Sequence, residues 1–201
     1  MQRVLLYIDG LSMKVGHAFA WCILVLTLSI CYEVFVRKVL RDPTAWAFDI
    51  SYIMYGALFM MGGAYALSRD AHVRGDFLFR LWPPRVQAGI EFVLYFLFFF
   101  PGVLALIYSG ADYAAESWRY KEVSINSPAG VPVFPLKIVM PVAAFFLLLQ
   151  GIAQTIRCIL CMKTGEWPPR LHDVEETERI LLASRELNAQ RDADTPSGVG
   201  R

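Results

Sequence analysis

Residues 86–108 read VQAGIEFVLYFLFFFPGVLALIY, and this run decides the class of fold. Glu91 is its one charged side chain, and a phenylalanine-rich centre precedes Pro101. A helix of about 20 residues crosses the roughly 30 Å hydrocarbon core of a bilayer, so the run is long enough to span it. The proline predicts a kink, which membrane helices tolerate better than soluble ones. We therefore expect a transmembrane helix here.

Three further apolar runs are long enough to cross a bilayer, at residues 15–36, 46–67 and 134–162. The first is longer than the roughly 7 to 15 apolar residues of a signal peptide, and no small-residue cleavage pattern follows it. We therefore expect it to be a retained span. Together the four runs predict an all-α integral membrane protein with four transmembrane helices.

Composition supports the same class. Of 201 residues, 56% are hydrophobic and 18% are charged, which is too apolar for a soluble domain of this size. The charged residues gather at the chain ends and in short breaks between the apolar runs, as in multi-span membrane proteins. A formal net charge of +1 offers no concentrated basic surface for phosphates, so we expect no nucleic-acid partner.

The runs divide the chain into an N-terminal segment (1–14), a transmembrane domain (15–162) and a charged tail (163–201). Within the tail, 171–190 is expected to form a short interfacial or soluble helix, and 192–201 to be disordered. The positive-inside rule sets the orientation. One side of the membrane would collect Arg3, Lys14, Arg69, Arg74, Arg80, Arg85, Arg157, Lys163 and Arg170, and the other Arg37, Lys38, Arg41, Arg119, Lys121 and Lys137. The larger first set predicts that both termini are cytoplasmic.

Asp49, Gly56 and Gly63 are spaced seven residues apart in the second run, so they share one helix face. Small residues on such a face let another helix come close. Two interpretations remain open: a docking face for a partner helix, or packing within the four-helix unit itself.

The fourth run contains a polar stripe of Gln150, Gln154 and Arg157. Hydrogen bonds between helices in lipid contribute on the order of 0.6 kcal/mol, and up to about 2. We interpret the stripe as helix packing rather than a conduction path, because a path would need matching polar groups at the same depth in the other spans, and we expect none there.

Two glutamates near the span ends have simple interpretations. Glu33 precedes Arg37 by four residues, which predicts an ion pair along one helix face. Glu91 lies one turn into the third run, where we expect its carboxylate to reach the lipid headgroups.

The sequence offers no convincing catalytic or cofactor site. Cys158 and Cys161 have the spacing of half a zinc site, but no second Cys or His pair accompanies them. A haem held by two histidines would need both at similar depth, and of His17, His72 and His172 only the first is near a span. No serine nucleophile has a plausible base, and no glycine-rich phosphate loop is present. We expect neither an enzyme nor a bound cofactor or metal.

Two stretches carry a family resemblance. Residues 62–78 read GGAYALSRDAHVRGDFL and contain a His-Val-Arg-x-Asp-x-Leu turn; residues 124–137 end in VFPLK and lead to Pro141. Both resemble the small membrane subunit of TRAP (tripartite ATP-independent periplasmic) transporters, the DctQ-type family. The resemblance covers about 15–160. It departs from the family's pattern at Asp49, where glutamate is frequent, and at Gly75, where an aliphatic residue is common.

The resemblance implies a role in the inner membrane of a bacterium. A periplasmic substrate-binding protein would deliver an organic acid, commonly a carboxylate, to a large permease subunit driven by a sodium gradient. The small subunit would be a non-catalytic scaffold beside that subunit. The residues then expected at a partner or lipid interface are Asp49, Gly56, Gly63, Arg69, His72, Arg74, Asp76, Gln150 and Gln154.

Two other functions compete with the scaffold. One is a membrane-anchor or accessory subunit of an electron-transfer enzyme, which would predict haem absorbance in the purified protein. The other is an autonomous small carrier, which would predict uptake by this chain alone. The lack of internal repeats and of broken glycine-rich helices argues against the carrier.

Overall fold

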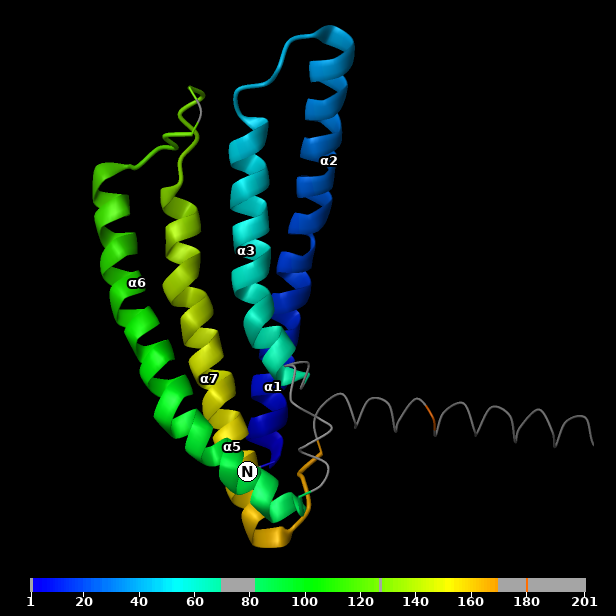
Figure 1. The fold of residues 1–201 in the computed structure, drawn as a ribbon, viewed down its shortest axis with the longest axis vertical. Helices are drawn as coiled ribbons and strands as arrows, with labels where there is room; N and C mark the ends of the chain where they lie inside the picture. The colour runs from blue at the N-terminus through cyan, green and yellow to red at the C-terminus, as the bar shows by residue number, and fades with distance from the viewer. Residues whose placement is uncertain (1, 70–81, 127, 170–179, 181–201) are drawn as a thin grey trace, which may run out of the picture. The chain divides into compact units, whose positions relative to one another are not determined.

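The computed structural model describes residues 2–69, 82–126, 128–169 and 180 (Figure 1). It divides into two units, 1–168 and 169–201, and every helix described below belongs to the first. Three of the expected interface residues, His72, Arg74 and Asp76, lie outside the described residues. So do the predicted helix at 171–190, apart from Ile180, and the tail end at 192–201.

Four long helical stretches make up the first unit; the first and third are divided into segments, and the second and fourth are continuous helices. In chain order the elements are α1 (Gln2–Ala20), α2 (Cys22–Phe35), the π-helical turn η1 (Val36–Leu40), α3 (Ala47–Ser68), α5 (Pro84–Leu94), the π-helical turn η2 (Tyr95–Phe99), α6 (Phe100–Tyr120) and α7 (Phe134–Thr164). The stretches long and apolar enough to cross a membrane are Gln2–Leu40, Ala47–Ser68, Pro84–Tyr120 and Phe134–Thr164. The prediction of an all-α protein with four membrane-spanning helices is confirmed.

Two helices extend well beyond the apolar runs that predicted them. The first begins at Gln2 rather than at residue 15, and the third continues to Tyr120 rather than ending at residue 108. The extensions contain charged residues, Asp9 in the first and Asp112 in the third among them. Hydropathy indicates where a helix lies in lipid, whereas backbone hydrogen bonding continues into the polar ends. The predicted spans therefore did not mark the helix ends.

The predicted irregularity at Pro101 takes the form of the π-helical turn η2. A proline has no N–H to donate to the carbonyl four residues earlier, here Leu97, and its ring crowds that carbonyl. A wider π turn immediately before the proline relieves this conflict. Pro141, inside α7, lies beside Gly110 of α6, where a Cβ atom would be 3.6 Å from the proline ring.

The fourth span, α7, is the central helix of the unit. It contacts α1, α3, α5 and α6, while α2 packs on α3 (Figure 1). Glycines allow the closest approaches: a Cβ atom on Gly151 would lie 2.2 Å from the ring of Phe99, and one on Gly16 would lie 2.6 Å from Cβ of Tyr65. The packing of α7 on η2, and that of α1 on α3, thus depends on small residues, as expected for helices in lipid.

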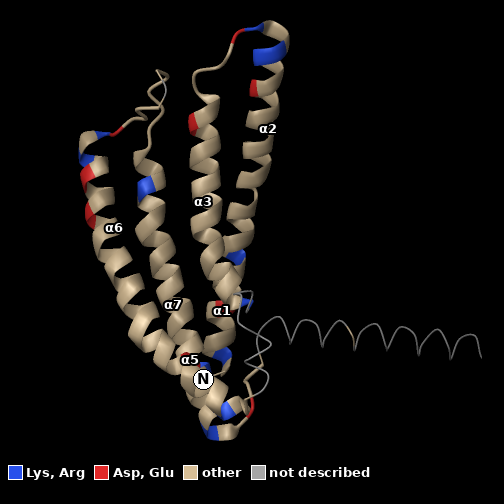
Figure 2. Cartoon of the chain, in the orientation of Figure 1, with Lys and Arg blue, Asp and Glu red and all other residues tan. Residues whose placement is uncertain are grey.

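Polar and apolar side chains are distributed as a membrane requires. Large apolar residues such as Leu28, Phe59 and Phe96 are exposed on the helix surfaces. Most charged residues lie near the helix ends, and the central stretches of α3 and α7 are free of them (Figure 2). Several polar side chains are buried instead, and these form two clusters.

Candidate functional site

The two clusters lie at opposite ends of α7. The loop cluster lies where residues 121–133 connect α6 to α7. The interior cluster lies between α1, α5 and the C-terminal half of α7. The loop cluster consists of Asp49, Tyr113, Glu122, Ser124 and Lys137; the interior cluster consists of Asp9, Ser12, Glu91, Gln150, Gln154, Arg157 and Cys158.

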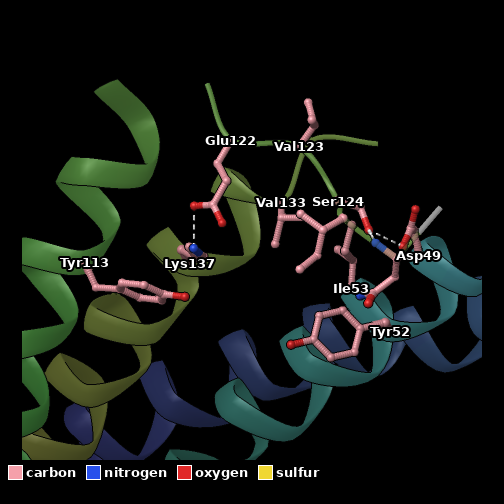
Figure 3. A pocket seen from close by; sticks show the side chains of 11 residues that line it. Asp49, Tyr52, Ile53, Tyr113, Glu122, Val123, Ser124, Val133 and Lys137 are labelled. Atoms are coloured by element: carbon pink, nitrogen blue, oxygen red, sulfur yellow. Dashed lines mark hydrogen bonds and ion pairs between the residues drawn. The ribbon is translucent and has the colours of Figure 1, made fainter. Parts of the chain in front are cut away.

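In the loop cluster, two polar contacts fasten the 121–133 connection to the helices on either side. Ser124 donates its hydroxyl hydrogen to Oδ1 of the buried Asp49 on α3, at 2.6 Å. Lys137 of α7 forms an ion pair with Glu122, and its Nζ lies 3.9 Å from the ring centroid of Tyr113 on α6. Three helices are therefore joined through one connection (Figure 3).

Backbone hydrogen bonds stiffen the same connection. The N–H of Ser124 donates to the carbonyl of Val131 at 2.8 Å, and that of Val133 donates to the carbonyl of Glu122 at 3.0 Å. The result is a short hairpin-like turn closed by an antiparallel bridge. Ile125 next to its tip is 97% exposed.

Beneath this turn lies a cavity of about 150 Å³. Polar and aromatic side chains of α3, α6, α7 and the connection line it, including Asp49, Tyr52, Tyr113, Ser124 and Lys137 (Figure 3). The hydrogen bond from Lys137 holds the pKa of the Glu122 carboxyl below its ordinary value. Lys137 and Glu122 thus pair with each other, and the carboxylate of Asp49 accepts a hydrogen bond from Ser124.

The interior cluster centres on Asp9, which is 2% exposed. Its Oδ1 accepts a hydrogen bond from Nε2 of Gln150 at 2.7 Å, and its Oδ2 pairs with Nη2 of Arg157 at 2.5 Å. Ser12, one turn along α1, donates to Oε1 of Gln150 at 3.1 Å. A carboxylate and a guanidinium are thus paired inside the unit and joined to an amide and a hydroxyl.

Glu91 of α5 faces inward as part of the same cluster. Its Oε2 accepts a hydrogen bond from Nε2 of Gln154 at 3.2 Å and one from the thiol of Cys158 at 3.5 Å. The interpretation that this carboxylate reaches lipid headgroups is therefore wrong: the side of α5 that carries it packs on α7. The expectation that no polar groups match the α7 stripe in the other helices is also wrong, because α1 and α5 supply them.

Other sequence predictions can be compared directly with the structure. Glu33 and Arg37 form the predicted ion pair at 2.5 Å, and Glu33 also accepts the N–H of Thr44 at 3.0 Å. Cys158 and Cys161 are both buried, and neither is part of a disulfide. Across the residues that the structure describes, no group of His, Cys, Asp or Glu is arranged to hold a metal ion.

The face of α3 that carries Asp49, Gly56 and Gly63 is directed at this chain's own helices and connection. A Cβ atom on Gly56 would lie 3.1 Å from Leu136, and one on Gly63 would lie 3.6 Å from Leu147, both on α7. These contacts match the packing interpretation of the two that the sequence left open. They are contacts within this chain and concern no partner.

The remaining described interface candidates are Gln150, Gln154 and Arg69. Both glutamines are buried and engaged within this chain. Arg69 is half-buried at the end of α3, where its guanidinium carbon lies 5.4 Å from the ring centroid of Tyr65.

Sequence reasoning missed Asp9, Ser12 and Ser124 as cluster members. Asp9 and Ser12 are three residues apart and so share a helix face with Gly16. That pattern becomes meaningful only once the first helix is known to begin at Gln2. No comparable signal marks Ser124, because its partner is set by how the 121–133 connection folds back.

Four long, apolar, closely packed helices with buried polar clusters define a multi-span α-helical membrane protein. Comparison with protein families gives the particular group. The chain matches "Tripartite ATP-independent periplasmic transporters, DctQ component" over residues 26–161, and it therefore belongs to the DctQ family. A search of curated proteins gives no match.

Membership identifies the chain as the small permease component of a TRAP transporter in the inner membrane. The family comprises transporter components rather than enzymes, and its members work with a large permease subunit and a substrate-binding protein. The alternative of an electron-transfer accessory subunit is not supported, because the matched family is one of transport.

Proposed function

We propose that this chain is a scaffold that supports the large permease subunit during sodium-driven, binding-protein-dependent uptake of an organic acid of the carboxylate class. One observation carries the proposal. The two polar clusters are separated along α7 by the uninterrupted apolar stretch 138–149. At 1.5 Å per residue, the distance from Lys137 to Gln150 is about 20 Å.

An apolar stretch of this length offers no route for an ion or a carboxylate. Small and apolar side chains occupy the middle of the unit, with Ala143 and Ala144 buried and Gly63 against Leu147. In the part of the chain that the structure describes, the polar groups form two closed sets rather than a path. Substrate and sodium sites would then belong to the large subunit.

The way the charged groups are used also supports a scaffold. Lys137 pairs with Glu122 and holds the 121–133 connection on α7, and Arg157 pairs with Asp9 and holds α7 against α1. A transport site instead needs polar groups that are free to exchange partners with substrate and ion.

The orientation and the contact surface complete the proposal. With both termini cytoplasmic, the loop cluster faces the periplasm, where the binding protein approaches. The cytoplasmic turn at 69–78, with Arg69, Arg74 and Asp76, would contact the large subunit or lipid phosphates. This part rests on the sequence, since two of those three residues lie outside the described ranges.

Co-purification and uptake test the proposal together. The tagged chain would be co-expressed with the large subunit of its transporter, and we expect both to elute as one complex from detergent. Sodium-dependent uptake in proteoliposomes should require the large subunit and the binding protein. Uptake by the present chain alone would overturn the scaffold in favour of the autonomous carrier. Purification without any bound large subunit would also contradict the proposal.

A further inference from the structure

The guanidinium of Arg157 is only partly satisfied. Arginine has five N–H donors, and Asp9 accepts from Nη2. The two other nitrogens, Nε and Nη1, have no hydrogen-bond partner in the structure, although the side chain is 1% exposed. Buried donors are rarely left without an acceptor, because removing them from water is costly, especially when they carry charge.

None of the neighbouring acceptors of the interior cluster lies within hydrogen-bond distance of Nε or Nη1. Asp9 uses one oxygen for Gln150 and the other for Nη2 of Arg157, and the carbonyl oxygen of Gln150 accepts from Ser12. Oε2 of Glu91 accepts from Gln154. Since no side chain of the cluster reaches Nε or Nη1, a bound molecule can supply their acceptor.

Burial and charge limit what that molecule can be. The side chain is closed off from the surface, so a lipid headgroup or an organic acid cannot reach it. Asp9 already balances the charge of Arg157. Glu91 adds a second carboxylate to the cluster, because it accepts hydrogen bonds from Gln154 and Cys158, which flank Arg157 along α7. An added anion would increase an excess of negative charge, and a cation would face N–H donors. A small neutral acceptor remains.

We propose that an internal water is bound at the Nε and Nη1 edge of Arg157. Water supplies the missing lone pairs, and its own hydrogens donate to the spare lone pairs of the surrounding carboxylates. The pair of Asp9 and Arg157 is thereby linked to Glu91, and α1, α5 and α7 share one hydrated network inside the membrane. This inference concerns the interior of the chain and does not depend on the scaffold function.

Water-edited solid-state NMR of the full chain in lipid bilayers tests the site. With ¹⁵N-arginine and ¹⁵N-alanine labels, the Nε–H signal of Arg157 is assigned by its absence in Arg157→Lys. We expect polarisation from water to reach this N–H as fast as it reaches that of exposed Arg41. Build-up as slow as at the backbone amide of buried Ala153 would overturn the proposal. The wild-type measurement decides the question even if the variant requires assignment by other means.

The ligand can also be distinguished from an anion. Replacing chloride by gluconate in the buffer should leave the Arg157 Nε–H chemical shift and its water transfer unchanged. A shift that follows the chloride concentration would overturn water in favour of a bound anion. Arg157→Lys keeps a cation for Asp9, so the protein should still purify as a folded unit and serve for the assignment.

Discussion

Asp9 of α1 and Arg157 of α7 lie 148 positions apart in the sequence, yet their charged atoms are 2.5 Å apart and almost fully buried. Breaking such a pair from one side leaves an uncompensated charge in a low-dielectric interior, which costs about 3–5 kcal/mol. Replacing both partners by apolar residues removes both charges and is much less costly.

We therefore expect Asp9→Leu alone, and Arg157→Met alone, to lower the thermal midpoint in detergent strongly. The double variant should recover most of the loss. Fluorescence-detected size-exclusion after heating gives the midpoints. Double-variant losses equal to the sum of the single losses would show that the two side chains act independently.

The close approach of Phe99 to α7 predicts that Gly151 tolerates no side chain. In Gly151→Ala the new methyl would overlap the Phe99 ring, and overpacking of this kind typically costs about 1–3 kcal/mol. Gly102→Ala on α6 is the matched control, because no atom lies within 4 Å of its Cβ position. Alanine there should be neutral or stabilising through helix propensity. Equal midpoints for the two variants would contradict the packing described for α7.

The hydrogen bond from Ser124 to Asp49 predicts how the 121–133 connection is held. In Ser124→Ala the buried carboxylate loses this donor, so we expect a free energy of unfolding lower by about 1–3 kcal/mol and a lower thermal midpoint. Hydrogen exchange should become faster at the backbone N–H groups of Ser124 and Val133, which donate to Val131 and Glu122. Ile125→Ser is the control, because that exposed side chain can change without loss of packing. Unchanged exchange in Ser124→Ala would show that the backbone bridge alone fixes the turn.

The ion pair of Glu122 with Lys137 predicts a dependence of stability on pH. The pKa of Glu122 is lowered in the folded protein from its ordinary 4.5, so the pair contributes fully above that value. Its contribution is lost as the pH falls from about 4.5 through the lowered pKa. We expect the difference in thermal midpoint between wild type and Glu122→Gln to be present at pH 7 and to shrink below pH 4.5. A difference that is constant over this range would show that the pair does not contribute.

How much of this could be predicted from the sequence depends on the length scale of the signal. The four spans and the pair of Glu33 with Arg37 follow from apolar run length and from a spacing of four residues. Both are local properties of the chain.

Only the α7 side of the interior cluster could be predicted from the sequence. The stripe of Gln150, Gln154 and Arg157 is visible along α7, but its partners Asp9 and Glu91 lie far away in the sequence. Hydropathy assigned Asp9 to a segment outside the membrane and Glu91 to the interface. Buried polar side chains need hydrogen-bond partners. The stripe on α7 therefore called for acceptors on other helices, and acidic residues are the acceptors that would also balance the charge of Arg157.

The central position of α7 has a consequence for how the protein is made. It is the last of the described helices to leave the ribosome, and it supplies the hydrogen-bond partners for carboxylates on α1 and α5, which were synthesised long before it. Until then Asp9 and Glu91 lack those partners. Completion of the fourth span is thus the event that closes the interior cluster.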